Sequence, residues 1–334
     1  MSVRLAINGF GRIGRNVLRA LMDRAPEGLE VVAINDLAPV ESSAHLFEYD
    51  SVHGRYGRPV TFDAHSLDVG RGPIRMTAER DPAALPWSDV DIVLECTGHF
   101  RDPAKAALHL QNGARRVLIS APAKGDVKTI VYGVNHDRIN ADDVILSNAS
   151  CTTNCLVPVA HVLHENFGIR RGHMTTVHSY TGTQPVHDRD HDDLYRARAA
   201  ALSMIPTTTG AAETLGLVLP ELAGRITGTA IRVPTPNVSC CDLVVETDST
   251  TTVQDVNDAM KAAAAEGPLA GILGVTDRKL VSIDFNHDPR SAIFATDQTA
   301  LQRGNLLRVL AWYDNEWAFS NRMLDTAGVM AAQL

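Results

Sequence analysis

The chain has 334 residues, of which 45% are hydrophobic and 21% charged, and its formal net charge is −8. This length suggests about two domains, and the composition excludes a disordered, collagen-like or small disulfide-stapled chain. An acidic chain with no run of Lys and Arg lacks the electrostatic footprint of a nucleic-acid-binding protein. No apolar stretch approaches the roughly 18 residues of a membrane helix, and a glycine loop stands where a signal peptide would have its apolar region. We therefore expect a cytoplasmic protein that binds neither nucleic acid nor membranes.

The first half of the chain alternates between short apolar runs and helical patterns. The runs predict strands at residues 3–8, 29–35, 90–96, 116–120, 129–133 and 144–148. Helical patterns lie between them, at residues 15–24 and 103–111. Alternation of strand and helix implies a parallel sheet that helices cover on both faces. The expected fold of this half is therefore α/β, with a doubly wound parallel sheet.

After about residue 150 the pattern changes to runs of strands with fewer helices. Strands are predicted at residues 173–178, 230–234, 240–247 and 307–313. The predicted helices are 152–167, 253–266 and 319–334. Segregated strands and helices favour an α+β domain with a mostly antiparallel sheet. No linker separates the halves, so the domain boundary must be a tight junction.

A glycine loop at residues 8–14 contains Gly-x-Gly-x-x-Gly between a strand and a helix. In this context Gly9 permits the tight turn, Gly11 lets the backbone approach a pyrophosphate, and Gly14 lets helix and strand pack closely. The helix start would hold the diphosphate through its N–H groups. Asp36 follows the second strand, where it would accept from ribose hydroxyls and repel a 2′-phosphate. The alternative is a turn that merely needs glycine, but the context favours NAD binding over NADP binding.

Cys151 lies where a strand ends and a helix begins, a position at which the helix dipole lowers the pKa of a thiol. Cys155, one turn further on, is expected to be a small core residue. His178 ends a strand and could form an ion pair with the Cys151 thiolate and act as a base, although a single histidine is more often structural. No metal site is expected, because Cys240 and Cys241 are adjacent and point to opposite sheet faces.

Two features could bind phosphate groups. Residues 207–212 place three threonines and a glycine before an apolar helix, and free N–H groups there would suit an anion; ordinary N-capping needs only one of these threonines. Arg196 and Arg232 lie among small or apolar residues. Each could bind a phosphorylated substrate as a guanidinium fork or be a solvated surface arginine.

Six segments together resemble the phosphorylating glyceraldehyde-3-phosphate dehydrogenase family over nearly the whole chain. They are, in order, INGFGRIGR, NASCTTNCL, HSYTGTQ, TTTGAA, RVPTPNVS and WYDNEW. The resemblance implies a Rossmann NAD-binding domain of residues 1–150 and 316–334, with a returning C-terminal helix. It implies a catalytic domain of residues 151–315 and a homotetramer.

The same resemblance implies the reaction: oxidation of D-glyceraldehyde 3-phosphate to 1,3-bisphosphoglycerate, with NAD and inorganic phosphate. Cys151 would be the nucleophile that forms a thiohemiacetal and then a thioester, and His178 would be the base. The implied cofactor residues are Gly9, Gly11, Arg12, Ile13, Gly14, Asp36, Arg80, Thr97, Ser120 and Asn315. The implied site for inorganic phosphate is Ser150, Thr152, Thr209 and Gly210. The implied site for the substrate phosphate is Thr181, Arg196 and Arg232.

Some residues depart from the pattern usual in this family. Thr183 replaces an acid, Tyr195 stands where an arginine is usual, and Phe319 replaces a tyrosine. Residues 281–289 are also similar to erythrose-4-phosphate dehydrogenase, whereas the Thr-Gly-Ala-Ala motif at 209–212 favours the triose enzyme. A catalytically idle, NAD-sensing protein is a further alternative, disfavoured because both the cysteine and the histidine are retained.

The cofactor preference carries a mixed signal. NAD-specific members of the family usually have a Leu-Pro pair where this chain has Arg189 and Asp190. Arg189 could reach a 2′-phosphate. We favour instead a surface ion pair between Arg189 and a neighbouring acid, and we expect NAD.

Overall fold

The computed structural model of the chain describes residues 2–334, which form two compact units. The first unit comprises the residues up to Ile130, together with His136–Ala149 and Ser320–Leu334. The second comprises Val131–Asn135 and Ser150–Phe319. The sequence predicted divisions after residues 150 and 315, whereas the units divide after Ala149 and Phe319.

The first unit is built on an eight-stranded sheet in the order β10-β9-β8-β1-β2-β7-β6-β5. Its strands are β1 (Val3–Asn8), β2 (Leu29–Asn35), β5 (Thr61–Phe62), β6 (Ser66–Asp68), β7 (Pro73–Thr77), β8 (Ile92–Glu95), β9 (Arg116–Ile119) and β10 (Ile145–Ser147). A separate hairpin pairs β3 (Tyr49–Asp50) with β4 (Gly54–Arg55). The helices of this unit are α1 (Arg12–Arg24), α2 (Val40–Glu48), α3 (Pro103–Ala106) and α4 (Leu108–Gln111), with most of α8 (Trp317–Ala331).

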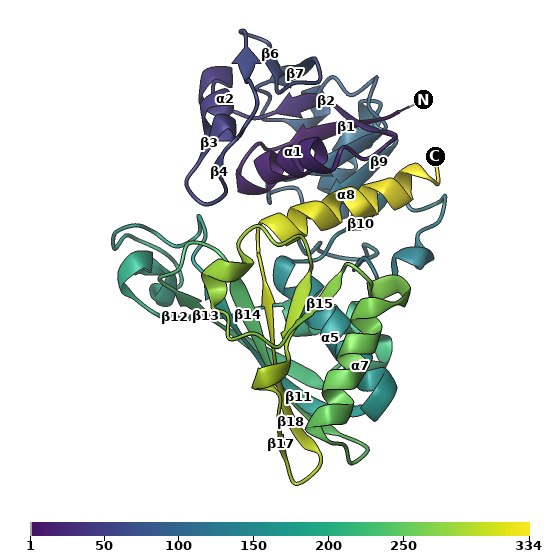
Figure 1. Cartoon of the computed structure of the whole chain (residues 1–334). Helices are drawn as coiled ribbons and strands as arrows, with labels where there is room; N and C mark the ends of the chain where they lie inside the picture. Colours follow the sequence, from purple (N-terminus) through teal and green to yellow (C-terminus); the bar gives the residue numbers. More distant parts are fainter. Residues whose placement is uncertain (1) are drawn as a thin grey trace. The chain divides into compact units, whose positions relative to one another are not determined.

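The six strands from β10 to β7 pair in parallel, and only the edge strands β6 and β5 are antiparallel. Helices α1 and α8 lie side by side (Figure 1), joined by an ion pair of 2.5 Å between Arg24 and Asp325. Thr326 of α8 donates to Asn148 after β10. The structure confirms the expected parallel-rich α/β class.

The second unit contains a sheet in the order β12-β13-β11-β14-β18-β16-β15, with β17 paired to β18. Its strands are β11 (Ile169–Ser179), β12 (Ile205–Thr207), β13 (Ile226–Val233), β14 (Ser239–Thr247), β15 (Leu273–Thr276), β16 (Ala292–Ala295), β17 (Ala300–Gln302) and β18 (Leu306–Tyr313). Its helices are α5 (Cys151–Phe167), α6 (Ala211–Val218) and α7 (Val253–Ala265), and Figure 1 shows α5 and α7 against the same face of the sheet. Only β11–β13 and β15–β16 pair in parallel. The expected mostly antiparallel sheet is confirmed.

Several predicted elements differ from the structure; β11 and β13, for example, begin at Ile169 and Ile226, four residues before their predicted starts. Helix α1 begins at Arg12, three residues before the predicted start, because the glycine turn leads directly into it. The strand predicted at residues 129–133 is wrong: Thr129 makes only an isolated bridge to Ser147. The helix predicted at residues 103–111 is divided in two at Ala107.

The three glycines in the glycine loop of the first unit differ in backbone conformation and in the space around them. Gly9 has a φ of +94°, and a Cβ there would lie 2.7 Å from the backbone nitrogen of Thr97. A Cβ on Gly14 would lie 2.2 Å from the carbonyl oxygen of Gly9. Gly11 has an ordinary φ of −71°, and a Cβ there would meet nothing within 4 Å. Gly9 and Gly14 are therefore required by the fold, whereas Gly11 leaves space open.

We predict that Gly14→Ala destabilises the protein by about 1–3 kcal/mol, because the added methyl group forces the helix away from the turn. Gly11→Ala should change the free energy of unfolding by less than about 0.5 kcal/mol. Urea unfolding of the two variants measures both values. Equal destabilisation by the two substitutions would contradict these separate roles.

Candidate active site

The first unit contains a pocket of about 470 Å³ at the carboxyl ends of its parallel strands. The strand order reverses between β1 and β8, the point at which open α/β sheets bind ligands. The pocket is lined by Asn8, Gly9, Gly11, Asn35, Asp36, Leu37, Glu79, Arg80, Cys96, Thr97, His99 and Phe100. Five of the predicted cofactor residues, Gly9, Gly11, Asp36, Arg80 and Thr97, are thus brought together.

The start of α1 suits a diphosphate. Its N-cap residue is Gly11, which offers no side-chain oxygen to the N–H groups of the first turn. An anion can therefore take the place that a capping side chain usually fills. The space beside Gly11 is open, and a side chain at this position would occupy part of that space. These two features fit the dinucleotide NAD, and Arg12 and Ile13 supply the first N–H groups of the helix.

Asp36 shapes the pocket as well as lining it. Its carboxylate accepts from the backbone nitrogen of Phe10 at 2.6 Å and from that of Ala38 at 2.9 Å. The carboxylate therefore connects the glycine loop to the end of β2. A second connection holds the same loop, since Arg12 donates to the buried carboxylate of Asp50 at 2.5 Å. Burial by itself raises the pKa of Asp50. The hydrogen bonds from Arg12, His53 and Val52 together have the larger effect and lower this pKa to about 2.

A buried polar chain beneath this pocket was missed by the sequence analysis. Asn35 Nδ2 donates to Asn8 Oδ1 at 2.8 Å, and Asn8 Nδ2 donates to Glu95 Oε2 at 2.6 Å. Glu95 also accepts from Thr97 N at 2.9 Å and faces Nε2 of His109 at 3.0 Å. Trp87 donates to His109 Nδ1, which leaves Nε2 to donate to Glu95. The sequence indicates this polar chain only through Glu95, an acidic residue at the end of the apolar strand β8.

Ser120 is not among the residues that line this pocket. Its backbone nitrogen donates to the carbonyl oxygen of Glu95 at 3.0 Å, which places it at the end of β9 beside β8.

In the second unit, Cys151 and His178 lie together. Cys151 is the first residue of α5, whose N-cap Ser150 accepts from the backbone nitrogen of Thr153. His178 is the second-last residue of β11. The Cys151 Sγ and the His178 Nε2 are 3.5 Å apart. A nucleophile at a helix start therefore has an imidazole nitrogen within reach.

Neither the Cys151 thiol nor the His178 imidazole adopts its charged form easily while the other stays neutral. Burial raises the pKa of the Cys151 thiol to about 11, although the charge of Arg232 opposes this. Burial, and then the charge of Arg232, lowers the pKa of His178 to about 3. The expectation that the helix start leaves Cys151 with a lowered pKa is therefore wrong for the thiol alone. A thiolate and an imidazolium can form only together, by transfer of one proton from Sγ to Nε2.

The other ring nitrogen fixes the orientation of His178. Its Nδ1 lies 2.7 Å from the carbonyl oxygen of Ser179 and 2.8 Å from the Arg232 NH1, which itself donates to the same carbonyl at 2.9 Å. A proton on Nδ1 donates to Ser179 O and leaves Nε2 as the acceptor toward Cys151. Tyr313 packs edge-on against the imidazole, with ring centroids 6.0 Å apart.

Arg232 and Arg196 form the cationic part of the expected phosphate sites. Arg196 donates to Thr207 Oγ1 at 2.8 and 3.0 Å and forms an ion pair with Asp193 at 3.3 Å. The charge of Arg196 lowers the pKa of Arg232, after the larger effect of burial. Arg232 pairs in register with Ile205, at the start of the strand that ends in Thr207. The positive charges of the two guanidinium groups thus oppose each other, which favours an anion beside them.

The threonines of the expected phosphate sites differ in availability. The Thr152 hydroxyl lies 2.9 Å from the Tyr313 hydroxyl and is buried, so its side chain is already paired. Thr209 accepts from Ala211 N at the start of α6, whose N-cap is Gly210. The Thr181 hydroxyl contacts that of Thr183 at 3.0 Å, where an acid is usual in the family that this sequence resembles.

Asn315, the last expected cofactor residue, belongs to the second unit. It follows β18 and accepts from the hydroxyls of Ser179 and Ser239, both at 2.8 Å. It is therefore connected directly to Ser179, the residue next to His178.

Arg189 does not form the expected ion pair. Asp188 pairs instead with Arg198 at 2.8 Å, and within residues 2–334 the Arg189 side chain has no salt-bridge partner. Tyr195 is largely exposed, whereas Phe319 is buried.

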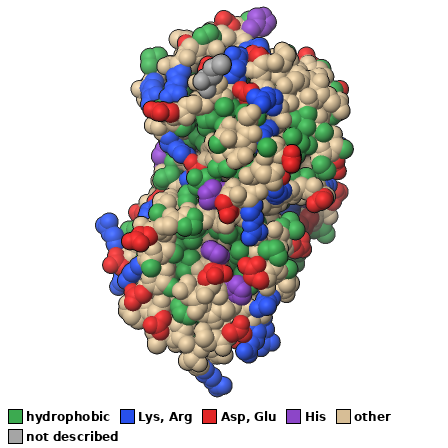
Figure 2. Space-filling model, turned by 90° about the vertical axis from the view of Figure 1, so that its right-hand side faces the viewer, with side chains coloured by type: hydrophobic (Ala, Val, Ile, Leu, Met, Phe, Trp, Pro, Cys, Tyr) green, Lys and Arg blue, Asp and Glu red, His purple; other side chains and the backbone are tan. Residues whose placement is uncertain are grey.

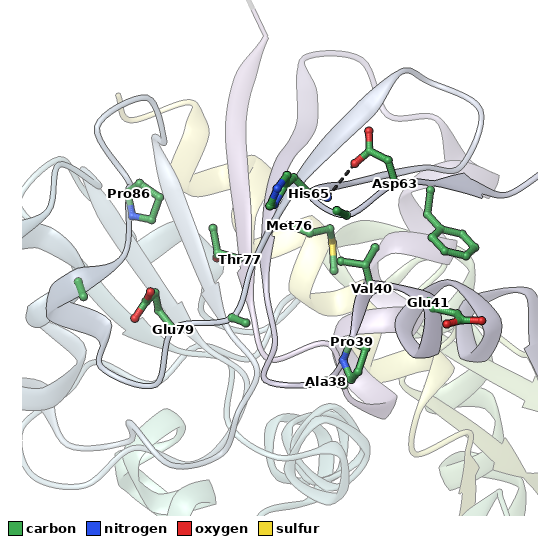
Figure 3. A pocket seen from close by; sticks show the side chains of 14 residues that line it. Ala38, Pro39, Val40, Glu41, Asp63, His65, Met76, Thr77, Glu79 and Pro86 are labelled. Carbon is green, nitrogen blue, oxygen red and sulfur yellow. Dashed lines mark hydrogen bonds between the residues drawn. The ribbon is translucent and has the colours of Figure 1, made fainter.

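A larger hollow in the first unit, of about 860 Å³, adjoins the cofactor pocket through Glu79. Figure 3 shows Pro39, Val40, Met76 and His65 around it. Neither a lysine nor an arginine lines it, and it lacks the glycine loop. The smaller pocket therefore has the better chemistry for a dinucleotide.

Neither a cluster of metal ligands nor a membrane-spanning helix is found among residues 2–334. No group of three or more His, Cys, Asp or Glu side chains is arranged to hold a metal ion. None of the helices in that range has the length and apolarity needed to span a bilayer.

Two family models match the chain, one within each of its two units. Residues 3–103 match the family model of the glyceraldehyde 3-phosphate dehydrogenase NAD binding domain, and residues 150–315 match that of the C-terminal domain. The chain is similar to glyceraldehyde-3-phosphate dehydrogenase of Cereibacter sphaeroides, with 62% identity over 100% of both chains. It is 60% identical to the Xanthobacter flavus protein of that name and 58% identical to the Pseudomonas aeruginosa one, each over 99% of both chains.

Proposed function

The chain belongs to the glyceraldehyde-3-phosphate dehydrogenase family, and we propose that Cys151 and His178 carry out its reaction. It is an NAD-dependent oxidoreductase that acts on D-glyceraldehyde 3-phosphate and phosphate in glycolysis. One observation carries the assignment of roles: the Sγ of Cys151, at the start of α5, lies 3.5 Å from Nε2 of His178. The pair has the geometry of a nucleophile with its base.

In the first step, Sγ attacks the aldehyde carbon while its proton passes to Nε2. The imidazolium then gives this proton to the developing alkoxide, which completes the thiohemiacetal. Because burial disfavours both charges separately, the proton transfer and the attack occur together.

In the second step, the thiohemiacetal loses its hydroxyl proton to Nε2 and a hydride from carbon, which leaves a thioester on Cys151. When bound, NAD supplies the nicotinamide carbon that accepts this hydride. Residues proposed to hold NAD are Gly9, Gly11, Arg12, Ile13, Gly14, Asp36, Arg80, Thr97, Ser120 and Asn315.

In the third step, inorganic phosphate attacks the thioester carbon and the thiolate leaves, which gives the acyl phosphate. We assign the attacking phosphate to Ser150, the backbone of Thr152, Thr209 and Gly210, since two helix starts offer N–H groups there. We assign the substrate phosphate to Thr181, Arg196 and Arg232. A phosphate beside Arg232 would also weaken the charge that holds His178 neutral.

The match of the whole chain to glyceraldehyde-3-phosphate dehydrogenases disfavours the tetrose and idle-protein alternatives. A catalytically inactive protein would not need the contact between Cys151 and His178.

We propose that the enzyme is a homotetramer in the cytoplasm, as the family resemblance implies. Exposed apolar side chains between residues 186 and 204 of the second unit support self-association: Val186, Leu194, Tyr195, Leu202 and Met204 are all more than half exposed. Exposed apolar patches commonly mark interfaces. On the face drawn in Figure 2, acidic and basic side chains are interspersed among apolar ones. Sedimentation of the purified chain tests the assembly, and a monomer would refute it.

We predict that Cys151→Ser abolishes aldehyde oxidation but leaves NAD binding intact. His178→Asn should slow the oxidation by about 10²–10⁴, the usual effect of losing a positioned base. Stopped-flow measurement of NADH formation and calorimetry of NAD binding give the two readouts. Substantial activity in Cys151→Ser would refute the nucleophile.

The pH dependence of Cys151 alkylation separates the pair from a single thiol. With His178 present, internal proton transfer adds a share of thiolate that does not depend on pH, so the iodoacetamide rate should climb by less than tenfold per pH unit between about pH 6 and 9. In His178→Asn, the raised pKa of Cys151 should make the rate climb about tenfold per pH unit over this range. Identical profiles in the two proteins would contradict a shared proton.

We predict that the enzyme prefers NAD over NADP by at least ~10² in kcat/KM, about 2.7 kcal/mol. Asp36 holds a carboxylate at the pocket edge, where it would repel a 2′-phosphate. Asp36→Asn removes the charge and should narrow this preference, while Arg189→Leu, the control, should change NAD kinetics little. Steady-state kinetics with both cofactors measure the preference, and equal use by the unmodified enzyme would make Arg189 a cofactor ligand.

A further inference from the structure

Glu95 is a buried carboxylate beneath the cofactor pocket of the first unit. It is the last residue of β8, and only 1% of its surface is exposed. Its one ion-pair partner among residues 2–334 is the imidazole of His109. A carboxylate that is buried without a lysine or arginine depends on hydrogen-bond donors for its stabilisation. The direction of the hydrogen bonds around Glu95 therefore determines which side chain this position accepts.

The first donor to Glu95 has its direction set by a backbone peptide. The Oδ1 of Asn35 accepts from the backbone nitrogen of Glu79 at 2.8 Å, and its Nδ2 donates to the carbonyl oxygen of Glu79 at 2.8 Å. A peptide N–H cannot accept and a carbonyl cannot donate, so the Asn35 amide has one orientation. Its Nδ2 also donates to Asn8 Oδ1, which leaves Asn8 Nδ2 to donate to Glu95 Oε2 at 2.6 Å.

The second donor has its direction set by an indole. The Nε1 of Trp87 can only donate, and it does so to His109 Nδ1 at 3.0 Å. The ring proton of His109 is therefore on Nε2, which lies 3.0 Å from Glu95 Oε2. Two independent chains, one from a peptide and one from an indole, thus end as donors on the same carboxylate oxygen.

The other oxygen of Glu95 faces donors from Thr97. The backbone nitrogen of Thr97 donates to Oε1 at 2.9 Å, and the Thr97 hydroxyl donates to the same oxygen. The hydroxyl oxygen itself accepts from the backbone nitrogen of His99 at 3.1 Å. Both oxygens of Glu95 thus meet donors only, so the carboxylate carries no proton. Hydrogen bonds to an ionised acceptor are about twice as strong as those between neutral groups.

These hydrogen bonds connect the ends of four adjacent strands. Asn8 and Asn35 are the last residues of β1 and β2, and Glu79 and Thr97 lie two residues beyond the ends of β7 and β8. The four strands are neighbours in the order β8-β1-β2-β7. All four residues line the cofactor pocket, and Gly9 of the glycine loop follows Asn8 directly. One carboxylate therefore holds the wall of the pocket from below.

We propose that Glu95 is a positioning residue for the cofactor pocket, and that NAD affinity depends on its negative charge although Glu95 does not itself line the pocket. This inference rests on the proposed placement of NAD in that pocket. The isosteric amide cannot replace the carboxylate. Turned one way, the NH₂ group of Glu95→Gln opposes the N–H of Thr97; turned the other way, it opposes the donors of Asn8 and His109. Either orientation leaves a buried donor without an acceptor, and the wall must shift to relieve it.

Calorimetry of NAD in the absence of aldehyde tests the proposal by binding alone. In Glu95→Gln the Kd for NAD should rise about tenfold, the upper equivalent of one hydrogen bond. Trp87→Phe is the matched control, because it removes the indole donor at the far end of the same buried chain and keeps every donor to Glu95. It should lower the urea midpoint of unfolding but change the Kd by less than about twofold.

Two binding results would overturn the proposal. An unchanged Kd in Glu95→Gln would mean that the pocket does not need the charge. An equal rise in Glu95→Gln and Trp87→Phe would mean that general destabilisation, and not the position of the wall, weakens binding.

Neutron diffraction from deuterium-exchanged crystals of the unmodified enzyme tests the hydrogen-bond directions without any variant, which covers the case that Glu95→Gln does not fold. Deuterium should be found on Asn8 Nδ2, His109 Nε2 and Thr97 Oγ1, each directed at Glu95. Deuterium on either oxygen of Glu95 would overturn the proposal.

The Asp36→Asn variant separates this proposal from the cofactor assignment on which it rests. If the pocket did not hold NAD, Asp36→Asn would leave the preference for NAD over NADP unchanged. If only the role of Glu95 were wrong, Asp36→Asn would still narrow that preference, and Glu95→Gln alone would have no effect on the Kd.

Discussion

The proposed chemistry of the second unit depends on the contact between the Cys151 Sγ and the His178 Nε2. Its 3.5 Å separation depends on α5 starting at Cys151 and on β11 continuing to Ser179. The Tyr313 hydroxyl contacts Thr152 on the helix and Thr176 on the strand, both at 2.9 Å. One phenol therefore connects the two elements whose ends carry the reacting atoms, and a buried phenol in contact with two hydroxyls loses both if either element shifts.

The general fold could be predicted from the sequence because periodicity reports burial. The five strands that the sequence predicted correctly in the first unit are mostly apolar runs, as a parallel sheet covered on both faces requires; they are β1, β2, β8, β9 and β10. The glycines at positions 9, 11 and 14 were interpretable because backbone geometry restricts them directly. The error at residues 129–133 has the same origin: the segment is apolar and buried, but a turn follows Thr129 and Ile130, so burial did not mean a strand.

The site could be predicted only in part. Cys151 and His178 were identified by their positions at the ends of elements, but their protonation depends on burial and on Arg232, which lies 54 positions further along the chain than His178. No local pattern indicates that a guanidinium will lie beside Nδ1. Glu95 was missed for the same reason, because its three partner residues come from β1, the segment after β8, and α4. The pairing of Asp188 with Arg198 in place of Arg189 also depends on how the loop folds back.

Ser179 has one further consequence for how the enzyme tolerates motion. Its carbonyl oxygen faces the ring of His178, and its hydroxyl holds the amide of Asn315. A displacement of this single residue would therefore carry the proton acceptor and the amide in the same direction. Errors in their two positions are correlated, and the distance between them changes less than either position does. A reaction that moves a proton and a hydride from one carbon centre requires that relative distance to be constant more than it requires either group to be still.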